Sequence, residues 1–272
     1  MRLLTKLQIL FPDSSGRTRK RWVEAGRVRV NGEVVRRADA ELGEGDTVEL
    51  GMPVPRLVGS LRRVHEDDDL IVIDKPPGLL TIATERERER TAYRMLAGER
   101  AAPAARRLYI VHRLDRETSG LLCFAKSLVA KRALQAQFAA RSVTRIYAAL
   151  VEGRVTHDEG VLRDRLHEDR SLRVHATADR RVGKEAVTRY RVLERRRETT
   201  LLELSLVTGR RAQIRVQLAR AGHPILGDRA HGSRRDPLHR LCLHATRLAF
   251  RHPRNGATVT FESAPPAAFA RL

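Results

Sequence analysis

Cysteine is nearly absent from this chain. Its 272 residues include 2 cysteines, Cys123 and Cys242, which lie far apart and in no C-x-x-C spacing. A disulfide framework or a zinc site built from cysteine pairs is therefore not expected. Each cysteine stands within an apolar segment, where a small buried thiol is the usual role.

The chain also lacks features that direct proteins into membranes. Residues 1–6 provide no apolar signal-peptide core, and no apolar run approaches the ~20 residues that cross a bilayer. We find no basic amphipathic helix with a bulky apolar face. We therefore expect no membrane association and a location in the reducing cytoplasm.

The common motifs of cofactor-dependent and hydrolytic enzymes are missing as well. There is no G-x-x-x-x-G-K-[ST], G-x-G-x-x-G, H-E-x-x-H or G-x-S-x-G. A group of histidines in the C-terminal third matches no zinc-ligand spacing. Its members are His223, His231, His239 and His244. We expect neither a cofactor nor a metal.

Negative charge is scarce, because 33 Asp+Glu face 53 Lys+Arg and give a formal net charge of +20. Such an excess attracts polyanions, and each neutralised phosphate releases a condensed counterion. Nucleic acid is the first candidate partner. A membrane surface is the rival partner, but the chain lacks the basic amphipathic helix that it would need. Two alternatives stay open: non-specific binding of polyanions, and an arginine-rich composition inherited from a thermophilic or GC-rich source.

The first fifty residues predict a small α+β module. Residues 14–26 are typical of a short basic helix, capped by a serine, with Trp22 and Val23 facing inward. Asn31-Gly32 between alternating residues is a strong hairpin signal, because both turn positions need a positive φ. A second turn at 43–46 leads into a strand. Residues 51–60 contain prolines that interrupt regular structure and are predicted to be a linker.

Residues 61–272 predict a second, larger α+β domain in which short strands and a few helices alternate. The predicted strands are 71–73, 121–125, 147–151 and 202–206, and the predicted helices lie near 130–138 and 211–221.

A polar segment interrupts apolar sequence at residues 112–120. Because it lies between two predicted buried strands, it must form a loop at a strand end, where catalytic groups are often presented. Asp115 stands between Arg113 and Arg116, which favours its charged form. An ionised carboxylate suits a nucleophile or a general base. On loop chemistry alone, an ordinary structural turn explains the segment equally well.

A second basic cluster occupies residues 208–215, where a predicted strand runs into Gly209 and a helix follows. Backbone amides and the arginines Arg210, Arg211 and Arg215 would converge there, which favours an anion site. An exposed basic helix start is the alternative.

The segment from His112 to Gly120, HRLDRETSG, resembles the signature of the RluA family of pseudouridine synthases. Further segments agree in the same order along residues 61–265. They are Asp74 to Gly78, Arg145 to Tyr147, residues 208–215 with Gly222 to Asp228, Leu243 to Ala245, and His252-Pro253. Residues 1–50 resemble the RNA-binding domain named after ribosomal protein S-four.

The resemblance implies a mixed, mostly antiparallel sheet with a central cleft, and it implies roles for individual residues. Asp115 would be the catalytic carboxylate, Arg215 its ion-pair partner, and Tyr147 would lie against the target uracil. Arg113 would fill the space left when the uridine flips out of the RNA. We assign the remaining RNA contacts to Arg116, Arg210, Arg211, Lys75, Arg19, Lys20 and Arg29. The isomerisation transfers no electrons and adds no group, so it needs no cofactor or metal.

The chain departs from the family pattern in two places. Ala212 and Gln217 stand where the third motif usually has histidines, and residues 80–83 replace a usual His-Pro pair. These changes bear on substrate contacts more than on activity.

The sequence therefore predicts isomerisation of specific uridines by a monomeric enzyme, in large-subunit ribosomal RNA rather than transfer RNA. A transfer-RNA enzyme and an inactive, ribosome-associated RNA-binding protein are the alternatives.

Overall fold

The structure is a computed structural model that describes residues 1–24, 27–35, 37–51, 61–84, 87–88, 90–99, 107–169, 171–179 and 181–272. They divide into two compact units. The first holds the described residues of Met1–Ser60 together with Ile82–Gly98, and the second holds Leu61–Thr81 and those of Glu99–Leu272. The predicted linker lies outside the described residues, apart from Gly51.

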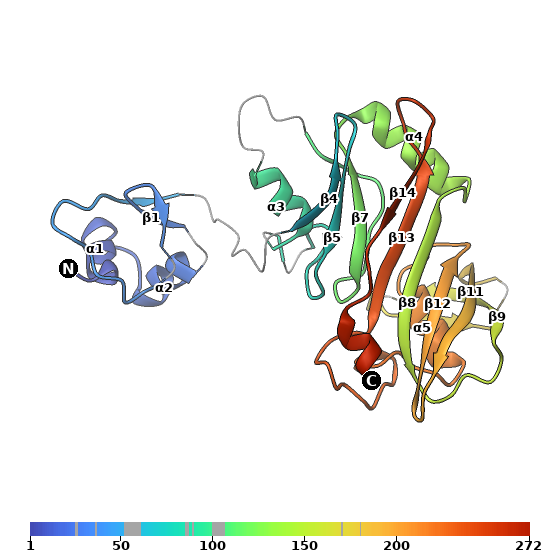
Figure 1. Ribbon diagram of the computed structural model, residues 1–272. Coiled ribbons are helices and arrows are strands. Elements are labelled where there is room, and N and C mark those ends of the chain that lie inside the picture. Colours follow the sequence, from blue (N-terminus) through green and yellow to red (C-terminus); the bar gives the residue numbers. More distant parts are fainter. Residues whose placement is uncertain are drawn as a thin grey trace. The chain divides into compact units, whose positions relative to one another are not determined.

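The N-terminal part of the first unit is a small α+β module (Figure 1). Its elements are α1 (Leu3–Leu10), α2 (Gly16–Glu24), β1 (Val28–Val30), β2 (Glu33–Val34) and β3 (Val48–Leu50), and the sheet order is β2-β1-β3. Both helices and the sheet bury apolar side chains in one shared core. Its buried members are Leu3, Leu7, Val23, Val28 and Leu42.

The predicted helix and hairpin of this module are confirmed. The Ser15 hydroxyl accepts a hydrogen bond from the Thr18 amide at 3.1 Å, close to the start of α2. Asn31 and Gly32 have φ values of 51° and 83°, the conformation of a tight hairpin turn. The predicted helix stop at Gly26 lies outside the described residues. Helix α1 was not predicted, because eight residues with one apolar stripe give a weak periodic signal.

The second unit is built on one large sheet. Its strands are β4 (Arg62–Glu66), β5 (Leu70–Lys75), β6 (Tyr109–Ile110), β7 (Ser119–Ala125), β8 (Thr144–Glu152), β9 (Glu159–Glu168), β10 (Val174–Thr177), β11 (Lys184–Arg195), β12 (Thr199–Leu206), β13 (Leu243–Arg251) and β14 (Thr258–Glu262). The order is β10-β9-β11-β12-β8-β13-β7-β5-β4, with β14 beside β13 and β6 beside β7. All of these pairs are antiparallel except β13 with β7. The predicted mixed, mostly antiparallel sheet is confirmed.

Strand β13 lies in the middle of the sheet, between β7 and β8 (Figure 1). It runs parallel to β7 over two residue pairs, one of which joins Ala245 to Gly120. Gly120 has a φ of 109°, and a Cβ atom there would lie 2.3 Å from the Ala245 carbonyl oxygen. Only glycine fits this contact, which lies at the end of the 112–120 loop.

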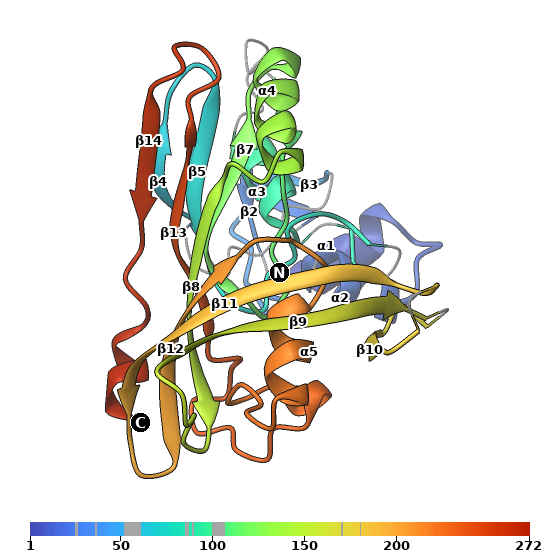
Figure 2. The ribbon, with the colours of Figure 1, turned by 90° about the vertical axis from the view of Figure 1, so that its right-hand side faces the viewer.

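Two helices cover the sheet of the second unit. Helix α4 (Leu128–Ala139) packs on β7 and β13, and α5 (Gln213–Arg220) packs on β9, β10 and β11 (Figure 2). The apolar faces predicted for these helices are confirmed, since Ala130, Leu134, Ile214 and Leu218 are buried. The remaining elements are α3 (Ala92–Glu99), η1 (Arg229–His231) and η2 (Ala267–Arg271). Within the described residues, no helix is long and apolar enough to span a bilayer.

Candidate active site

The segment predicted as a loop, residues 112–120, follows β6, and its last two residues are the first two of β7. It is fixed by hydrogen bonds from distant parts of the second unit. The Thr81 hydroxyl accepts from the Leu114 amide at 3.1 Å and donates to the Leu114 carbonyl at 2.9 Å. Within the loop, the Thr118 amide donates to the Asp115 carbonyl at 3.2 Å. The Thr81 side chain thus satisfies both backbone polar groups of Leu114 and fixes the backbone immediately before Asp115.

Lys75 holds the other side of Asp115. Its ammonium group donates to the carbonyls of Arg116 at 3.0 Å, Leu79 at 2.7 Å and Pro76 at 2.9 Å. The residue has 0% exposure, and burial lowers its pKa to about 7 against the attraction of nearby carboxylates. An RNA contact by Lys75 does not fit this geometry, because its three donors already have protein acceptors.

His112 anchors the start of the loop as a neutral side chain. Its Nε2 atom accepts from the Cys123 amide at 3.0 Å, so the ring proton belongs on Nδ1. Burial lowers the pKa of His112 to about 3, helped by the charge of Arg145. The ring stacks on Phe138 with centroids 4.9 Å apart.

Both cysteines, Cys123 and Cys242, are free and buried as predicted.

A cleft of about 460 Å³ opens beside this loop and brings the main predicted site residues together. Asp115, Tyr147 and Arg215 line it, as do Arg113 and Arg210. They come from the 112–120 segment, from β8, from α5 and from the residues that lead into α5. Within the described lining, Asp115 is the single carboxylate among five arginines, the others being Arg141 and Arg145.

Arg215 lies between two carboxylates. Its Nη1 atom is 3.7 Å from Asp115 Oδ2, while its Nε and Nη2 atoms donate to both oxygens of Asp228 at 2.8 and 2.7 Å. The Asp228 side chain is 1% exposed, and it also contacts His231 at 3.0 Å. This bidentate pair fixes the plane of the guanidinium and leaves one nitrogen directed toward Asp115.

The charges of this group are set by their contacts. Burial acts to raise the pKa of Asp228, but hydrogen bonds from Arg215 and His231 outweigh it and lower the pKa to about 2. Burial acts to lower the pKa of Arg215, and the hydrogen bond to Asp228 raises it above its ordinary value. Both groups are therefore charged at neutral pH. We assigned no role to Asp228 from the sequence. The one feature that could have indicated a role is its position as a carboxylate that follows the apolar residues 225–226.

Tyr147 lies on β8 with its ring against the cleft and is 7% exposed. Burial raises the pKa of its phenol to about 12, although Arg145 acts in the opposite direction. The phenol is therefore neutral at physiological pH. It can donate a hydrogen bond or stack on a planar ligand.

The two departures from the family pattern have different surroundings. Gln217 is 1% exposed and bonds the Leu162 and Ala186 carbonyls, so it contributes to packing rather than to the cleft. Ala212 lines the cleft and has a φ of 49° at the start of α5. One backbone donor of the anion site predicted here is already used within the protein, because Gln213 Oε1 accepts from the Arg210 amide at 2.9 Å.

The other residues assigned to RNA contact lie outside the cleft lining. Arg116 is exposed and donates to the Gly78 carbonyl at 3.2 Å, and Arg211 pairs with Glu168. In the N-terminal module, Lys20 is exposed on α2. Arg19 bonds the Ser14 carbonyl, and Arg29 donates to the Gly32 carbonyl at 3.0 Å.

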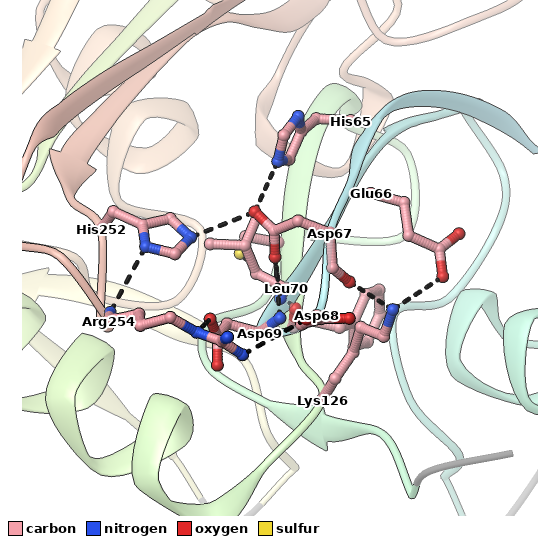
Figure 3. A network of polar contacts seen from close by, with 11 residues as sticks. His65, Glu66, Asp67, Asp68, Asp69, Leu70, Lys126, His252 and Arg254 are labelled. Atoms are coloured by element: carbon pink, nitrogen blue, oxygen red, sulfur yellow. Dashed lines mark hydrogen bonds and ion pairs between the residues drawn. The ribbon is translucent and has the colours of Figure 1, made fainter. Parts of the chain in front are cut away.

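A second polar cluster joins the β4–β5 turn to the β13–β14 turn (Figure 3). Ligand atoms of Asp67, Asp69 and His252 lie within 4.8 Å of one another, a spacing compatible with a metal ion. The oxygens of Asp67 already accept from His65, His252 and the amides of Asp69 and Leu70. Asp69 accepts from Arg254 at 2.6 Å. The cluster therefore serves to hold the two turns together.

Comparisons with known proteins agree with this geometry. The family described as RNA pseudouridylate synthase matches residues 69–220, and the S4 domain matches residues 1–48. Ribosomal large subunit pseudouridine synthase D of Haemophilus ducreyi is 35% identical, over 100% of this chain and 89% of its own. The uncharacterized RNA pseudouridine synthase YlyB of Bacillus subtilis is 36% identical, over 93% and 86%. The solved structure of human RNA pseudouridylate synthase domain containing 1 superposes with a TM-score of 0.65 and 25% identity, covering 78% of this chain and 86% of that one.

Proposed function

The chain belongs to the RNA pseudouridylate synthase family, and from this membership we propose that it isomerises specific uridines in large-subunit ribosomal RNA. The family makes it an isomerase that acts on RNA. The choice of ribosomal RNA is supported by relatives named ribosomal large subunit pseudouridine synthase D that match along nearly their whole length. An S4 domain and a net charge of +20 suit a polyanionic substrate.

Asp115 is assigned the catalytic role because no other carboxylate lines the described part of the cleft. Arg215 faces Asp115 at 3.7 Å. We assign to Asp115 the reaction with the target nucleoside, in which the bond from the anomeric carbon to the ring nitrogen breaks. The uracil then turns and reattaches through a ring carbon, so no atom is gained or lost.

The neighbours of Asp115 suit supporting roles. Arg215 orients the carboxylate and places a positive charge beside it, because its own position is fixed by Asp228. Tyr147 offers a neutral ring for stacking on the uracil and a hydroxyl for proton transfer. Arg113 is exposed at the cleft and can occupy the space that the flipped uridine leaves in the RNA. We further propose that the enzyme acts as a monomer in the cytoplasm.

Pseudouridine mapping tests the proposed substrate. Ribosomal and transfer RNA would be mapped from cells that carry the gene, lack it, or carry Asp115→Asn. We expect one or more sites in large-subunit ribosomal RNA to disappear in both altered strains. A site lost only from transfer RNA would overturn the ribosomal assignment. A map that is identical in all strains would favour an inactive RNA-binding protein.

The N-terminal module is expected to contribute phosphate contacts through α2. Replacing its exposed residues Arg17, Lys20 and Arg21 by glutamine should weaken RNA binding and flatten its salt dependence. Each lost contact removes about 0.7 to 0.9 from the slope of log K against log salt. The measurement is a titration of RNA binding at several salt concentrations.

The matched control changes the net charge by the same amount away from the module. It replaces the exposed residues Arg154, Arg173 and Arg234 of the second unit. An equal change of slope in the two triple variants would show that total charge, rather than α2, sets the salt dependence.

A further inference from the structure

Arg145 is a cation of the cleft that has no carboxylate partner in the described part of the protein. It lies on β8, two residues before Tyr147 and on the same face of the strand. Arg215, by contrast, pairs with Asp115 and Asp228. Arg113 and Arg141 are exposed to solvent. Arg210 is half-buried like Arg145, but its Nε atom donates to the Glu185 carbonyl at 3.1 Å. Arg145 is therefore the arginine among the described lining residues that combines the lack of a carboxylate partner with a buried, unpartnered Nε atom.

The hydrogen bonds of Arg145 are also incomplete. A guanidinium has five N–H donors. One hydrogen bond is made, from Nη2 to the Leu206 carbonyl at 3.4 Å, and the Nε atom is buried without any partner. Burial lowers the pKa of Arg145 below its ordinary value, although the Tyr147 phenol acts in the other direction. Removing a cation from water in this way is unfavourable unless a ligand supplies the opposite charge.

The surroundings nevertheless hold the guanidinium in one place. It lies over the Phe138 ring, 5.5 Å from the centroid. Gly209 gives it room on the other wall of the cleft, since a Cβ atom at position 209 would be 2.4 Å from Nη1. Such preorganisation, without a protein acceptor, is typical of a site whose acceptor is the ligand.

We propose that Arg145 binds one of the two phosphates that flank the target uridine. The proposal rests on the proposed function, because it places the nucleoside between Asp115 and Tyr147. When the sugar lies against Asp115 and the uracil against Tyr147, the phosphodiester that continues the RNA chain must pass along the cleft wall. Arg145 is the fixed cation on that wall, and a phosphate oxygen accepts charge-assisted hydrogen bonds from a planar guanidinium.

The first test needs neither a known target nor turnover. Binding of uridine 5′-monophosphate and uridine 3′-monophosphate would be compared with binding of uridine, using the full-length wild type, Arg145→Gln and Arg132→Gln. Arg132 is exposed on α4 outside the cleft, so its variant makes the same change of charge elsewhere. We expect the wild type and Arg132→Gln to bind one nucleotide roughly 10- to 100-fold more tightly than uridine, and Arg145→Gln to lose that preference.

The second test uses RNA that contains the mapped uridine, with each flanking phosphate replaced in turn by an uncharged methylphosphonate. One replacement should weaken wild-type binding by roughly 10-fold or more and leave Arg145→Gln unaffected, because the contact is already missing. Equal weakening of both proteins at both positions would overturn the proposal. A wild type that shows no preference for either nucleotide over uridine would overturn it too.

Two further variants separate a lost contact from a lost fold. Arg145→Lys keeps the charge and should retain part of the preference. Gly209→Ala keeps the Arg145 side chain but displaces its guanidinium. This variant should lose part of the preference for the nucleotide over uridine. Its circular dichroism spectrum should match that of the wild type. Full preference in Gly209→Ala would count against a preorganised site. Failure of the proposed function would appear differently, as phosphate preference that depends on Arg145 in a protein that forms no pseudouridine.

Discussion

Asp115→Asn is expected to slow pseudouridine formation by roughly 1,000-fold or more while RNA binding stays nearly unchanged. Asparagine keeps the shape of the side chain, so the loop held by Thr81 and Lys75 should remain in place. It lacks the negative charge and the basicity that any route through this carboxylate requires. Single-turnover product formation at saturating enzyme, together with the dissociation constant for the same RNA, measures both effects.

Glu117→Gln is the matched control, because Glu117 is a carboxylate of the same loop that is absent from the cleft lining. Its side chain is half-exposed beside Arg116. We expect this variant to keep most of the activity. If Glu117→Gln were as slow as Asp115→Asn, the loss would reflect damage to the loop, and the assignment of Asp115 would fail.

The second large effect concerns Arg215, whose replacement by methionine should lower both stability and activity. The change leaves the buried carboxylate of Asp228 without its guanidinium, which typically costs about 3–5 kcal/mol in the free energy of unfolding. Asp115 also loses its cationic neighbour. Denaturant unfolding and single-turnover kinetics report the two consequences separately.

A double variant tells them apart. Arg215→Met combined with Asp228→Asn removes the uncompensated charge, so it should regain a substantial part of the lost stability. It should not regain activity, since the guanidinium that faces the Asp115 carboxylate is still missing. A double variant as unstable as the single one would contradict the buried ion pair, and a double variant with restored activity would contradict the role of Arg215.

Local patterns predicted much of the fold. Asn31-Gly32 specified its hairpin because the required backbone angles depend on those two residues alone. The apolar spacing of Ala130 and Leu134 specified the buried face of α4. The polar run around Asp115 indicated a loop between strands for the same reason, since alternation of polar and apolar sequence is a short-range signal.

Long-range contacts explain what sequence reasoning missed. Thr81 and Lys75 hold the Asp115 loop from positions 33 and 41 residues away from their partners, and no local pattern records such a pairing. Lys75 and Arg145 have the same sign of charge and both stand near family motifs. They differ in their hydrogen-bond partners. Lys75 donates to three carbonyl groups of the protein, whereas Arg145 donates to one and keeps unpartnered donors at the cleft.

The place of β13 in the sheet has a consequence for the order in which the protein acquires activity. Apart from Leu243, every described residue of the cleft lining precedes β13 in the chain, yet in the sheet of the described strands β13 lies between β7 and β8 and pairs with both. A nascent chain synthesised as far as Cys242 thus carries Asp115, Tyr147 and Arg215, the residues that we propose for catalysis, while β7 and β8 each have an edge that β13 has not yet paired. Closing such non-local pairings is slow, and open edges invite aggregation until it happens. The step from inactive to active enzyme should therefore be abrupt, because it requires β13 to pair with both β7 and β8.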